Sequence, residues 1–351
     1  MTQAATATLP APLIELQGVS KTFSQPGSVI TRVSDAILQR PARKQVWAVD
    51  DVSLTIKEGE VVGLVGESGC GKSTLGRMAA FIHQPTSGNV LYEGRSVWNA
   101  PASTFRDAQL RTQMIFQDPF ASLNPRFRVR DIIGEAPLMH GLIDKSEVDD
   151  YVDELLKRVG INPAFRFRFP HQFSGGQRQR ISIARALAVK PRVLVCDESV
   201  SALDVSVQAQ ILNLFMELRD DLGLSYLLIS HDLSVVRHIS DSVAVMYLGR
   251  VVEQAPAQEL FEAPNHPYSR LLMAGLPTVK ERHKRFEAIP GELPSPMAPP
   301  PGCHFHTRCP EVMPICSAGV PELLPVGSQR LAACHLNTST DLKVHHAGKL
   351  S

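Results

Sequence analysis

Residues 61–73 read VVGLVGESGCGKS, and this stretch decides the fold. A short apolar run leads into the glycine-rich loop GESGCGKS at 66–73, and helix-forming STLGRMAAFI follows. All eight loop positions fit the pattern G-x-x-x-x-G-K-S in the strand–loop–helix context that identifies a phosphate-binding loop. Glycines let backbone N–H groups approach phosphate oxygens where a Cβ would obstruct them, and a helix N-terminus attracts anions. The stretch therefore predicts an α/β fold with a phosphate-binding loop.

The loop residues have expected places around ATP. We expect the Lys72 ammonium to reach the β- and γ-phosphates and the Ser73 hydroxyl to ligate Mg²⁺. A glycine turn that binds nothing is the alternative, and it is disfavoured because every position fits in context. The predicted ATP-binding residues of the loop are Gly66, Glu67, Ser68, Gly69, Cys70, Gly71, Lys72, Ser73 and Thr74.

A second apolar run, VLVCDE at 193–198, ends in two carboxylates. Asp197 is placed to hold Mg²⁺ through water, and Glu198 to polarise the attacking water. Neighbouring residues at a strand end point in different directions, which suits two different roles. Such a pair is often only the start of a solvated loop, but the phosphate-binding loop upstream favours the catalytic interpretation.

Composition excludes several classes of protein. The 351 residues carry 36 Lys and Arg against 35 Asp and Glu, so no global basic field indicates nucleic acid as a partner. No apolar run approaches the roughly 20 residues of a membrane-spanning helix, and the N-terminus MTQAATATLPAP lacks the features of a signal peptide. We therefore expect a cytoplasmic protein with reduced thiols.

The chain changes character along its length. From Leu13 to about Pro264, apolar runs alternate with amphipathic stretches, as in an α/β domain with a buried sheet. Residues 143–160 carry apolar side chains at helical spacing, and residues 26–45 read as an insertion. Ten prolines between 290 and 325 argue against regular sheet or helix there. The expected strands are Val61–Val65, Val193–Cys196, Leu224–Ile229 and Ser242–Tyr247.

The stretch FSGGQRQRISIARAL at 173–187 resembles the signature helix of the ATP-binding cassette (ABC) ATPases. In that family the start of this helix docks on the γ-phosphate of an ATP bound to a second cassette. The resemblance implies that Ser174, Gly175, Gly176 and Gln177 act in this way across a dimer interface. Because each motif occurs once in this chain, a second cassette is implied.

Other landmarks of that family follow in order. Gln117, in FQDP, resembles the Q-loop residue that senses Mg²⁺ and couples the nucleotide to the transport domain. Asp204, in SALD, resembles the D-loop aspartate that contacts the opposing site, and His231, in LLISHDLS, the switch histidine near the γ-phosphate. The resemblance thus implies Glu198, His231 and Gln117 as catalytic residues, with Mg²⁺ held by Ser73, Gln117 and Asp197. Phe23, in VSKTF, occupies the position of the aromatic that stacks on adenine, with Trp47 as a rival.

Four longer stretches resemble the dipeptide and oligopeptide importer branch: QDPFASLNPRFRV at 117–129, SALDVSVQAQILNLF at 201–215, HPYSRLLMAGLP at 266–277 and GELPSPMAPPPGCHFHTRCP at 291–310. Phe173 replaces the usual Leu of the signature and Ser199 the usual Pro after the two carboxylates. The resemblance implies a P-loop NTPase of ABC type with a RecA-like core, a helical insert and a Pro/Cys-rich C-terminal extension. The implied boundaries are 13–264 for the ABC ATPase domain, about 118–185 for the helical subdomain, 265–336 for the extension, and 1–12 and 337–351 for the tails.

The resemblance also implies a function and partners. It indicates an ATP-hydrolysing subunit that drives uptake of di- or oligopeptides and lies peripherally on the cytoplasmic face of the cell membrane. A second ABC ATPase, related but different, two transmembrane permease subunits and, indirectly, a solute-binding protein are the implied partners. Nickel, glutathione or a peptide-like antibiotic are alternative solutes, and a soluble ABC ATPase acting on nucleic acid or the ribosome is the alternative class. The stretch FRFRF at 165–169 is expected on the surface of the helical insert, facing a membrane subunit rather than nucleic acid.

Four cysteines, Cys303, Cys309, Cys316 and Cys334, gather in the proline-rich segment. In a reducing compartment such a group favours metal ligation over disulfides. The close C-x2-4-C pair of structural zinc sites is missing. The resemblance implies a four-iron four-sulfur cluster, with zinc and unliganded thiols as alternatives. We further expect loss of one of these cysteines to loosen the extension while sparing a distant ATP site.

Overall fold

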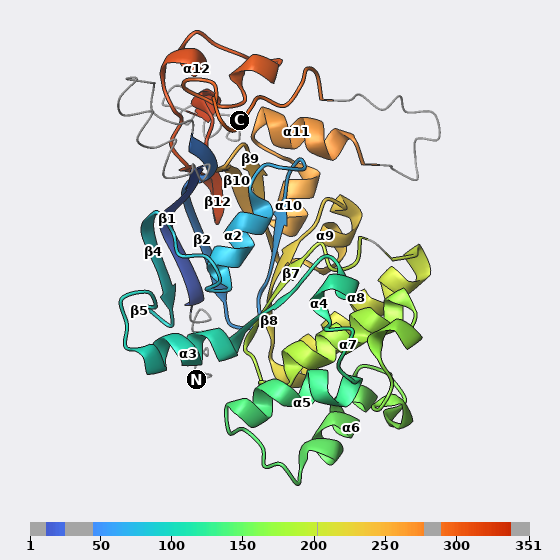
Figure 1. Ribbon diagram of the computed structural model, residues 1–351. Coiled ribbons are helices and arrows are strands. Elements are labelled where there is room, and N and C mark those ends of the chain that lie inside the picture. Colours follow the sequence, from blue (N-terminus) through green and yellow to red (C-terminus); the bar gives the residue numbers. More distant parts are fainter. Residues whose placement is uncertain (1–11, 25–44, 202, 277–288, 338–351) are drawn as a thin grey trace, which may run out of the picture.

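The computed structural model describes residues 12–24, 45–201, 203–276 and 289–337 (Figure 1). Most of the predicted insertion, residues 26–44, and most of both tails lie outside the described residues. The described residues form two sheets with helices packed around them. Helices α5 (Val129–Met139) and α6 (Val148–Arg158) lie at one end of the molecule, and α11 (Pro267–Ala274) and α12 (Ile315–Ala318) lie at the other.

Five parallel strands form the centre of the larger sheet, and all four predicted strands are among them. Their order is β9-β3-β8-β7-β6. Alternate residues enter two hydrophobic cores, since Val62 and Leu64 lie in one core and Val61 and Val65 in the other. Burial on both faces explains why these strands are continuous apolar runs. The strands are β3 (Val61–Val65), β6 (Thr112–Ile115), β7 (Val193–Asp197), β8 (Ser225–Ile229) and β9 (Ser242–Tyr247).

An antiparallel sheet of order β2-β1-β4-β5 covers one of the two cores. Its strands are β1 (Pro12–Ser24), β2 (Gln45–Lys57), β4 (Ser87–Tyr92) and β5 (Arg95–Ser96). Helix α2 (Lys72–Ala79) packs into this core through Leu75 and Met78, both fully buried. Helix α3 (Ala102–Arg111) precedes β6. Helix α2 is therefore fixed along its length, which holds its N-terminus in one place.

Helices cover the other core. They are α4 (Pro119–Ser122), α5 (Val129–Met139), α6 (Val148–Arg158), α7 (Gly175–Leu187), α8 (Val205–Leu222) and α9 (Leu233–Ile239). The helix expected within 143–160 is α6, which buries Val148, Val152, Leu155 and Leu156. It starts at Val148, the first apolar residue of that pattern, and directly before it the Glu147 carboxylate accepts a hydrogen bond from the Asp144 backbone N–H and closes a turn.

The C-terminal part extends the larger sheet. Strand β10 (Arg250–Pro256) pairs with β9 on one side and with β12 (Arg330–Ala332) on the other, and β11 (Leu324–Gly327) forms the edge. The expectation that prolines exclude regular sheet here is wrong. Pro325 lies in β11 at the edge of the sheet, where proline is tolerated because no further strand requires a backbone N–H from it. The remaining helices are α10 (Ala257–Glu262), α11 (Pro267–Ala274) and α12 (Ile315–Ala318).

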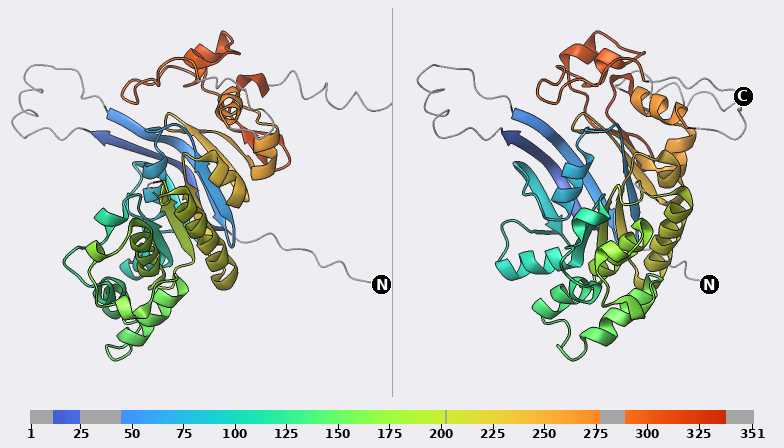
Figure 2. Two further views of the ribbon diagram at one scale, coloured as in Figure 1. Left: turned by 90° about the vertical axis from the view of Figure 1, so that its right-hand side faces the viewer. Right: turned by 45° about the vertical axis from the view of Figure 1, so that its right-hand side comes forward.

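Three buried aromatic rings attach this part to the sheet. Tyr247 ends β9, Tyr268 lies on α11, and Phe305 lies in the proline-rich segment. Ring centroids are 4.7 Å apart for Tyr247–Tyr268, 5.2 Å for Tyr247–Phe305 and 5.3 Å for Tyr268–Phe305. Residues 289–336, the proline-rich part of the extension, thus pack on the end of the sheet opposite the helical insert (Figure 2). Within the described chain, none of the helices is both long enough and apolar enough to cross a membrane.

Candidate nucleotide site

The loop between β3 and α2 requires glycine at two positions. Gly66 and Gly71 have φ angles of 151° and 109°. A Cβ at Gly66 would lie 2.1 Å from the carbonyl oxygen of Met246, and one at Gly71 would lie 2.0 Å from that of Ala48. Neighbouring backbone therefore leaves no room for a side chain, and the loop reaches the N-terminus of α2 in the conformation that its sequence predicts.

Lys72 begins α2 and lies inside this loop. Its side chain is buried, and the Nζ ammonium donates to the carbonyl oxygens of Gly66 at 2.8 Å and Glu67 at 2.9 Å. Two carbonyls thus fix a cation beside the helix N-terminus, where the positive end of the helix dipole also lies. This arrangement suits an anion with several negative charges.

The three residues predicted to hold Mg²⁺ line one cleft. The Ser73 hydroxyl donates to Asp197 Oδ1 at 2.8 Å, which connects the start of α2 to the end of β7. Burial raises the pKa of Asp197, while the hydrogen bond from Ser73 opposes this change. Oxygen atoms of this kind are the ligands that Mg²⁺ prefers. The cleft has a volume of about 500 Å³ and is lined by Ser73, Arg77, Phe116, Gln117, Asp118, Ala121, Ser122 and Asp197.

Glu198 brings together the three predicted catalytic side chains. It has a φ of 45°, in the left-handed region, and its N–H donates to the carbonyl of Ile229 at 3.0 Å. Gln117 Nε2 donates to Glu198 Oε2 at 2.7 Å, and His231 Nδ1 lies 3.5 Å from Glu198 Oε1. Strained backbone of this type clusters at functional sites. The loops that follow β6, β7 and β8 therefore meet at one carboxylate.

The signature residues form an exposed helix start. Ser174 Oγ accepts from the Gln177 N–H at 3.3 Å, and Gln177 Oε1 accepts from the Ser174 N–H at 3.1 Å, a reciprocal capping box. Ser174 and Gly175 are exposed, as is Asp204, which starts α8 without using its carboxylate as a cap. A Cβ at Gly175 would contact Leu203 at 3.7 Å, so the two motifs lie side by side. Their polar groups are open to a partner.

The two aromatic candidates for adenine stacking lie on paired strands. Phe23 on β1 and Trp47 on β2 are 39% and 41% exposed. Trp47 pairs with Thr22, so it projects to the opposite face of the two-stranded ribbon from Phe23. The Phe23 ring contacts the His83 ring edge-on, whereas Trp47 is held through its backbone, whose N–H donates to the Pro296 carbonyl of the extension at 3.3 Å. Only one of them can face a given nucleotide.

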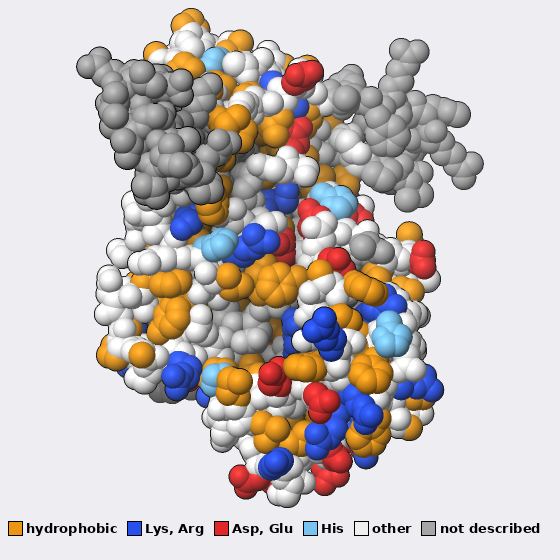
Figure 3. All heavy atoms as spheres, viewed as in Figure 1, with side chains coloured by type: hydrophobic (Ala, Val, Ile, Leu, Met, Phe, Trp, Pro, Cys, Tyr) orange, Lys and Arg blue, Asp and Glu red, His pale blue; other side chains and the backbone are white. Residues whose placement is uncertain are grey.

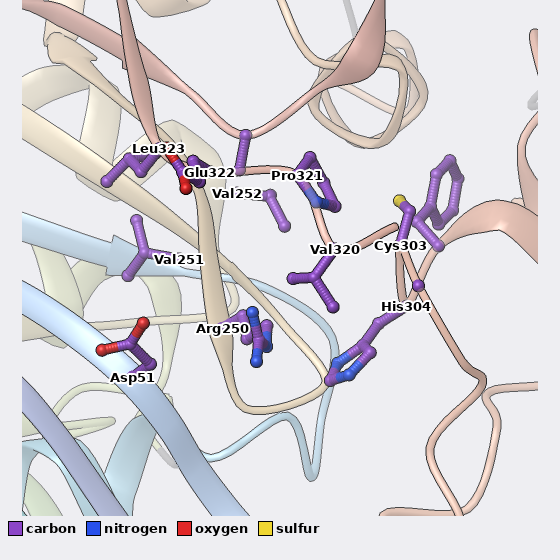
Figure 4. A pocket seen from close by; sticks show the side chains of 13 residues that line it. Asp51, Arg250, Val251, Val252, Cys303, His304, Val320, Pro321, Glu322 and Leu323 are labelled. Carbon is purple, nitrogen blue, oxygen red and sulfur yellow. The ribbon is translucent and has the colours of Figure 1, made fainter. Parts of the chain in front are cut away.

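The four extension cysteines are free thiols in one region. The Cys303 N–H donates to the Cys316 carbonyl at 2.8 Å. Burial raises the pKa of Cys303 and Cys309, and raises that of Cys334 to about 11, with neighbouring thiols adding to each rise. Within the described ranges, however, no three His, Cys, Asp or Glu side chains converge closely enough to hold a metal ion. Cys303 also borders a pocket of about 400 Å³ between β10 and the extension, beside His304 (Figure 4).

One expectation about the extension is wrong. The ATP site is not distant from it, because Arg308, directly before Cys309, forms an ion pair with Glu67 in the phosphate-binding loop. Nothing in the sequence around Arg308 predicts a place for it in this site. The two residues are 241 positions apart, and no local pattern pairs them.

The stretch FRFRF lies on the surface of the helical insert, as expected. Arg166 donates to both Asp153 carboxylate oxygens, and the Arg168 guanidinium lies 3.8 Å from the centroid of the Phe165 ring. Figure 3 shows basic and apolar side chains gathered over this part of the molecule. Phe120, Phe127 and Phe167 are exposed hydrophobic residues of the same insert.

Comparisons with known proteins agree on a family. Residues 49–201 match the ABC transporter family, and residues 252–316 match the oligopeptide/dipeptide transporter C-terminal region. The oligopeptide transport ATP-binding protein AppF of Bacillus subtilis is 47% identical over 328 residues, which cover 92% of this chain and 97% of AppF. The di/tripeptide transport ATP-binding protein DppF of Pseudomonas aeruginosa is 47% identical, covering 83% of this chain and 90% of DppF.

Solved structures give the same fold. The ATP-binding cassette MJ0796, in a dimer bound to ADP and Pi, superposes with a TM-score of 0.59 at 26% identity. The match covers 70% of this chain and 99% of that one. The loop, the sheet and these relatives lead to one conclusion: the chain belongs to the ABC transporter family of ATP-binding proteins, in the branch that carries the oligopeptide/dipeptide C-terminal region.

Proposed function

We propose that the chain is the ATP-hydrolysing subunit of an importer that takes up di- or oligopeptides across the cytoplasmic membrane. The observation that carries the proposal is near-full-length similarity to ATP-binding proteins named for oligopeptide and di/tripeptide transport, the C-terminal region included. Its units are an ABC ATPase domain at 13–264, with a helical subdomain at about 118–185, and a C-terminal extension at 265–336.

In this proposal each residue of the site has one role. Lys72 binds the β- and γ-phosphates, and Ser73, Gln117 and Asp197 hold Mg²⁺, which neutralises phosphate charge when bound. Glu198 accepts the proton of the attacking water, and His231 approaches the γ-phosphate. The hydrogen bonds that already join Ser73 to Asp197 and Gln117 to Glu198 support this assignment.

The signature and D-loop residues would serve a second ATPase. Ser174, Gly175, Gly176 and Gln177, with Asp204, are proposed to complete the site of a related but different partner subunit. Their position at exposed helix starts supports this role, since N–H groups there are available to an anion.

The helical insert is the proposed contact with the membrane. Two permease subunits would dock on the surface that includes Phe120, Phe127 and Phe167, which holds the ATPase peripherally on the cytoplasmic face. Exposed aromatic and arginine side chains are typical of protein interfaces. A solute-binding protein would act only indirectly, and nucleic acid is not a proposed partner.

We further propose that the four cysteines hold a four-iron four-sulfur cluster. Four free thiols lie in this segment, and burial, with neighbouring thiols, raises the pKa of Cys303, Cys309 and Cys334. They fit this donor set, because a cation would stabilise their thiolates. The close C-x2-4-C pair that is typical of structural zinc sites is missing from these four cysteines. The cluster would supply cross-links to a segment with little core of its own. Anaerobically purified protein is expected to be brown with roughly four irons per chain; colourless protein with one zinc would contradict the cluster.

Uptake in a strain that lacks the gene tests the transport function. Loss of labelled di- and tripeptide uptake is expected, with recovery by the wild-type gene but not by Glu198→Gln. Loss of nickel, glutathione or peptide-like antibiotic uptake instead, with peptide uptake intact, would contradict the peptide substrate while leaving the ATPase role in place.

A further inference from the structure

Arg308 of the extension forms an ion pair with Glu67 of the phosphate-binding loop. Its Nη1 donates to Glu67 Oε2 at 2.6 Å, and its Nη2 donates to Glu67 Oε1 at 3.0 Å. Such a two-point contact between a guanidinium and a carboxylate is strong and fixes both groups in orientation. The contact is therefore more specific than general packing of the extension on the core.

Arg308 is committed to this contact by its burial. Its side chain is 4% exposed, Nε donates to the Pro290 carbonyl at 2.9 Å, and Nη1 lies 3.4 Å from Tyr247 Oη. Among the described ion pairs, Glu67 supplies the carboxylate that balances this buried charge. Loss of one partner would leave the other uncompensated, which is strongly unfavourable for a buried pair.

A second residue beyond β10 holds Glu67 through its backbone. The Glu67 N–H donates to Tyr268 Oη at 2.9 Å. Tyr268 lies on α11, is fully buried, and packs between Tyr247 and Phe305. Backbone and side chain of one loop residue are thus both fixed by the C-terminal part of the chain.

The residue that is held in this way also orients Lys72. Lys72 Nζ donates to the Glu67 carbonyl at 2.9 Å. Contacts therefore run without a gap from Arg308 through Glu67 to the ammonium assigned to the phosphates. Arg308 also neutralises the Glu67 carboxylate, whose charge would otherwise repel a polyphosphate in the same loop.

We propose that Arg308 is a positioning residue for nucleotide binding. It holds Glu67, and through it Lys72, in the geometry that receives ATP, so that the extension is a working part of the ATP site. This inference rests on the ATP site proposed above. Because the contacts involve the phosphate-binding loop and not Glu198, Arg308 acts on nucleotide affinity and not on the rate at which bound ATP is hydrolysed.

The full-length chain, purified with its extension intact, tests the proposal. Arg308→Met keeps the length of the side chain and removes its charge. We expect the Kd for MgATP, measured by calorimetry, to rise about tenfold, a usual magnitude for coupling through a contacting residue. In the assembled transporter KM for ATP should rise similarly while kcat stays within about twofold. Arg270→Ala is the matched control, since Arg270 pairs with Glu311 of the extension at 2.7 Å and, among the described residues, makes no hydrogen bond or ion pair with the phosphate-binding loop.

Two further variants test the route of the effect. Glu67→Gln should raise the Kd as Arg308→Met does, and the double variant should be no worse than either single one, because both remove the same pair. Arg308→Lys should recover part of the affinity, since an ammonium keeps the charge but not the two-point geometry. If Arg308→Met fails to fold, Arg308→Lys and Glu67→Gln carry the test.

The results separate two kinds of failure. The inference is overturned if the Kd is unchanged in the folded Arg308 and Glu67 variants, or if it rises equally in Arg270→Ala. In either case the ATP site itself still stands if Lys72→Ala abolishes binding. An unchanged Kd in Lys72→Ala removes the ATP site itself, and the inference with it. A fall in kcat with KM unchanged would place Arg308 in the chemical step and also overturns the positioning role.

Discussion

At the scale of single residues, Glu198 is the proposed catalytic base. Its carboxylate already meets Gln117 and His231, and its backbone is strained, so its geometry is set before the reaction. Glu198→Gln should retain ATP binding and lower turnover by about 10²-fold or more, because an amide cannot accept the proton. Lys72→Ala should weaken binding itself. Affinity and hydrolysis measured on both variants separate the roles, and normal turnover in Glu198→Gln would remove Glu198 from the mechanism.

The adenine contact can be decided by fluorescence. Of the two tryptophans in the chain, Trp47 is 41% exposed and lies beside the phosphate-binding loop through Ala48. If Phe23 stacks on adenine, Phe23→Ala should raise the Kd for ATP by about tenfold, as loss of one aromatic stacking partner does, and Trp47→Ala should change it little. The reverse result, with strong quenching of Trp47 emission by ATP, would identify Trp47 as the platform instead.

At the scale of elements, the start of α11 depends on a neutral histidine. His266 is 1% exposed, and its Nδ1 accepts from the Tyr268 N–H at 3.0 Å. Burial, with Arg270 nearby, lowers the pKa of His266 to about 3. His266 therefore stays unprotonated in the folded protein. In the unfolded chain it takes up a proton as the pH falls below the ordinary histidine pKa near 6.5.

Stability should accordingly fall with acid. The contribution of His266 is complete above about pH 6.5 and is lost as the pH falls towards 3, at up to about 1.4 kcal/mol per pH unit. His266→Asn keeps a capping oxygen but has no titrating group at this position. Between pH 7 and pH 5, the free energy of unfolding of this variant should therefore fall by about 2 kcal/mol less than that of the wild type. Urea unfolding at both values measures this difference. An equal loss of unfolding free energy between pH 7 and pH 5 in His266→Asn and in the wild type would contradict this prediction. The variant His140→Asn, at an exposed histidine, is the control.

Elements also show what a sequence can predict. The strands before the phosphate-binding loop and before Glu198 were predictable because they are apolar runs buried on both faces. The hairpin β11–β12 was not, because its pairing depends on β10, about 75 residues earlier, and prolines obscure it. Likewise, two local motifs identify Lys72, Ser73 and Asp197 as candidates, whereas Arg308 joins the site only through folding of the whole chain.

At the scale of the whole molecule, one phosphate-binding loop and one signature predict an incomplete ATPase. The purified subunit should hydrolyse ATP poorly and gain activity in its membrane complex, because the proposed role of Ser174 is at another chain's nucleotide. Ser174→Cys should cross-link in the presence of ATP to a cysteine in the partner's phosphate-binding loop, whereas Leu142→Cys, at an exposed position in the loop after α5, should not. Efficient trapping within a single monomer would refute this geometry.

The pairing of β12 with β10 has a consequence for truncated chains. Glu253 on β10 is fully buried, accepts from the N–H groups of Asn265 and His266 at 2.7 and 2.8 Å, and lies 3.6 Å from Arg330 on β12. A chain cut before residue 324 would lose that arginine and expose a row of unpaired backbone groups along β10. Bare edges of this kind recruit strands from other molecules. Removal of the last two strands alone would therefore expose a sheet edge that acts as a template for aggregation.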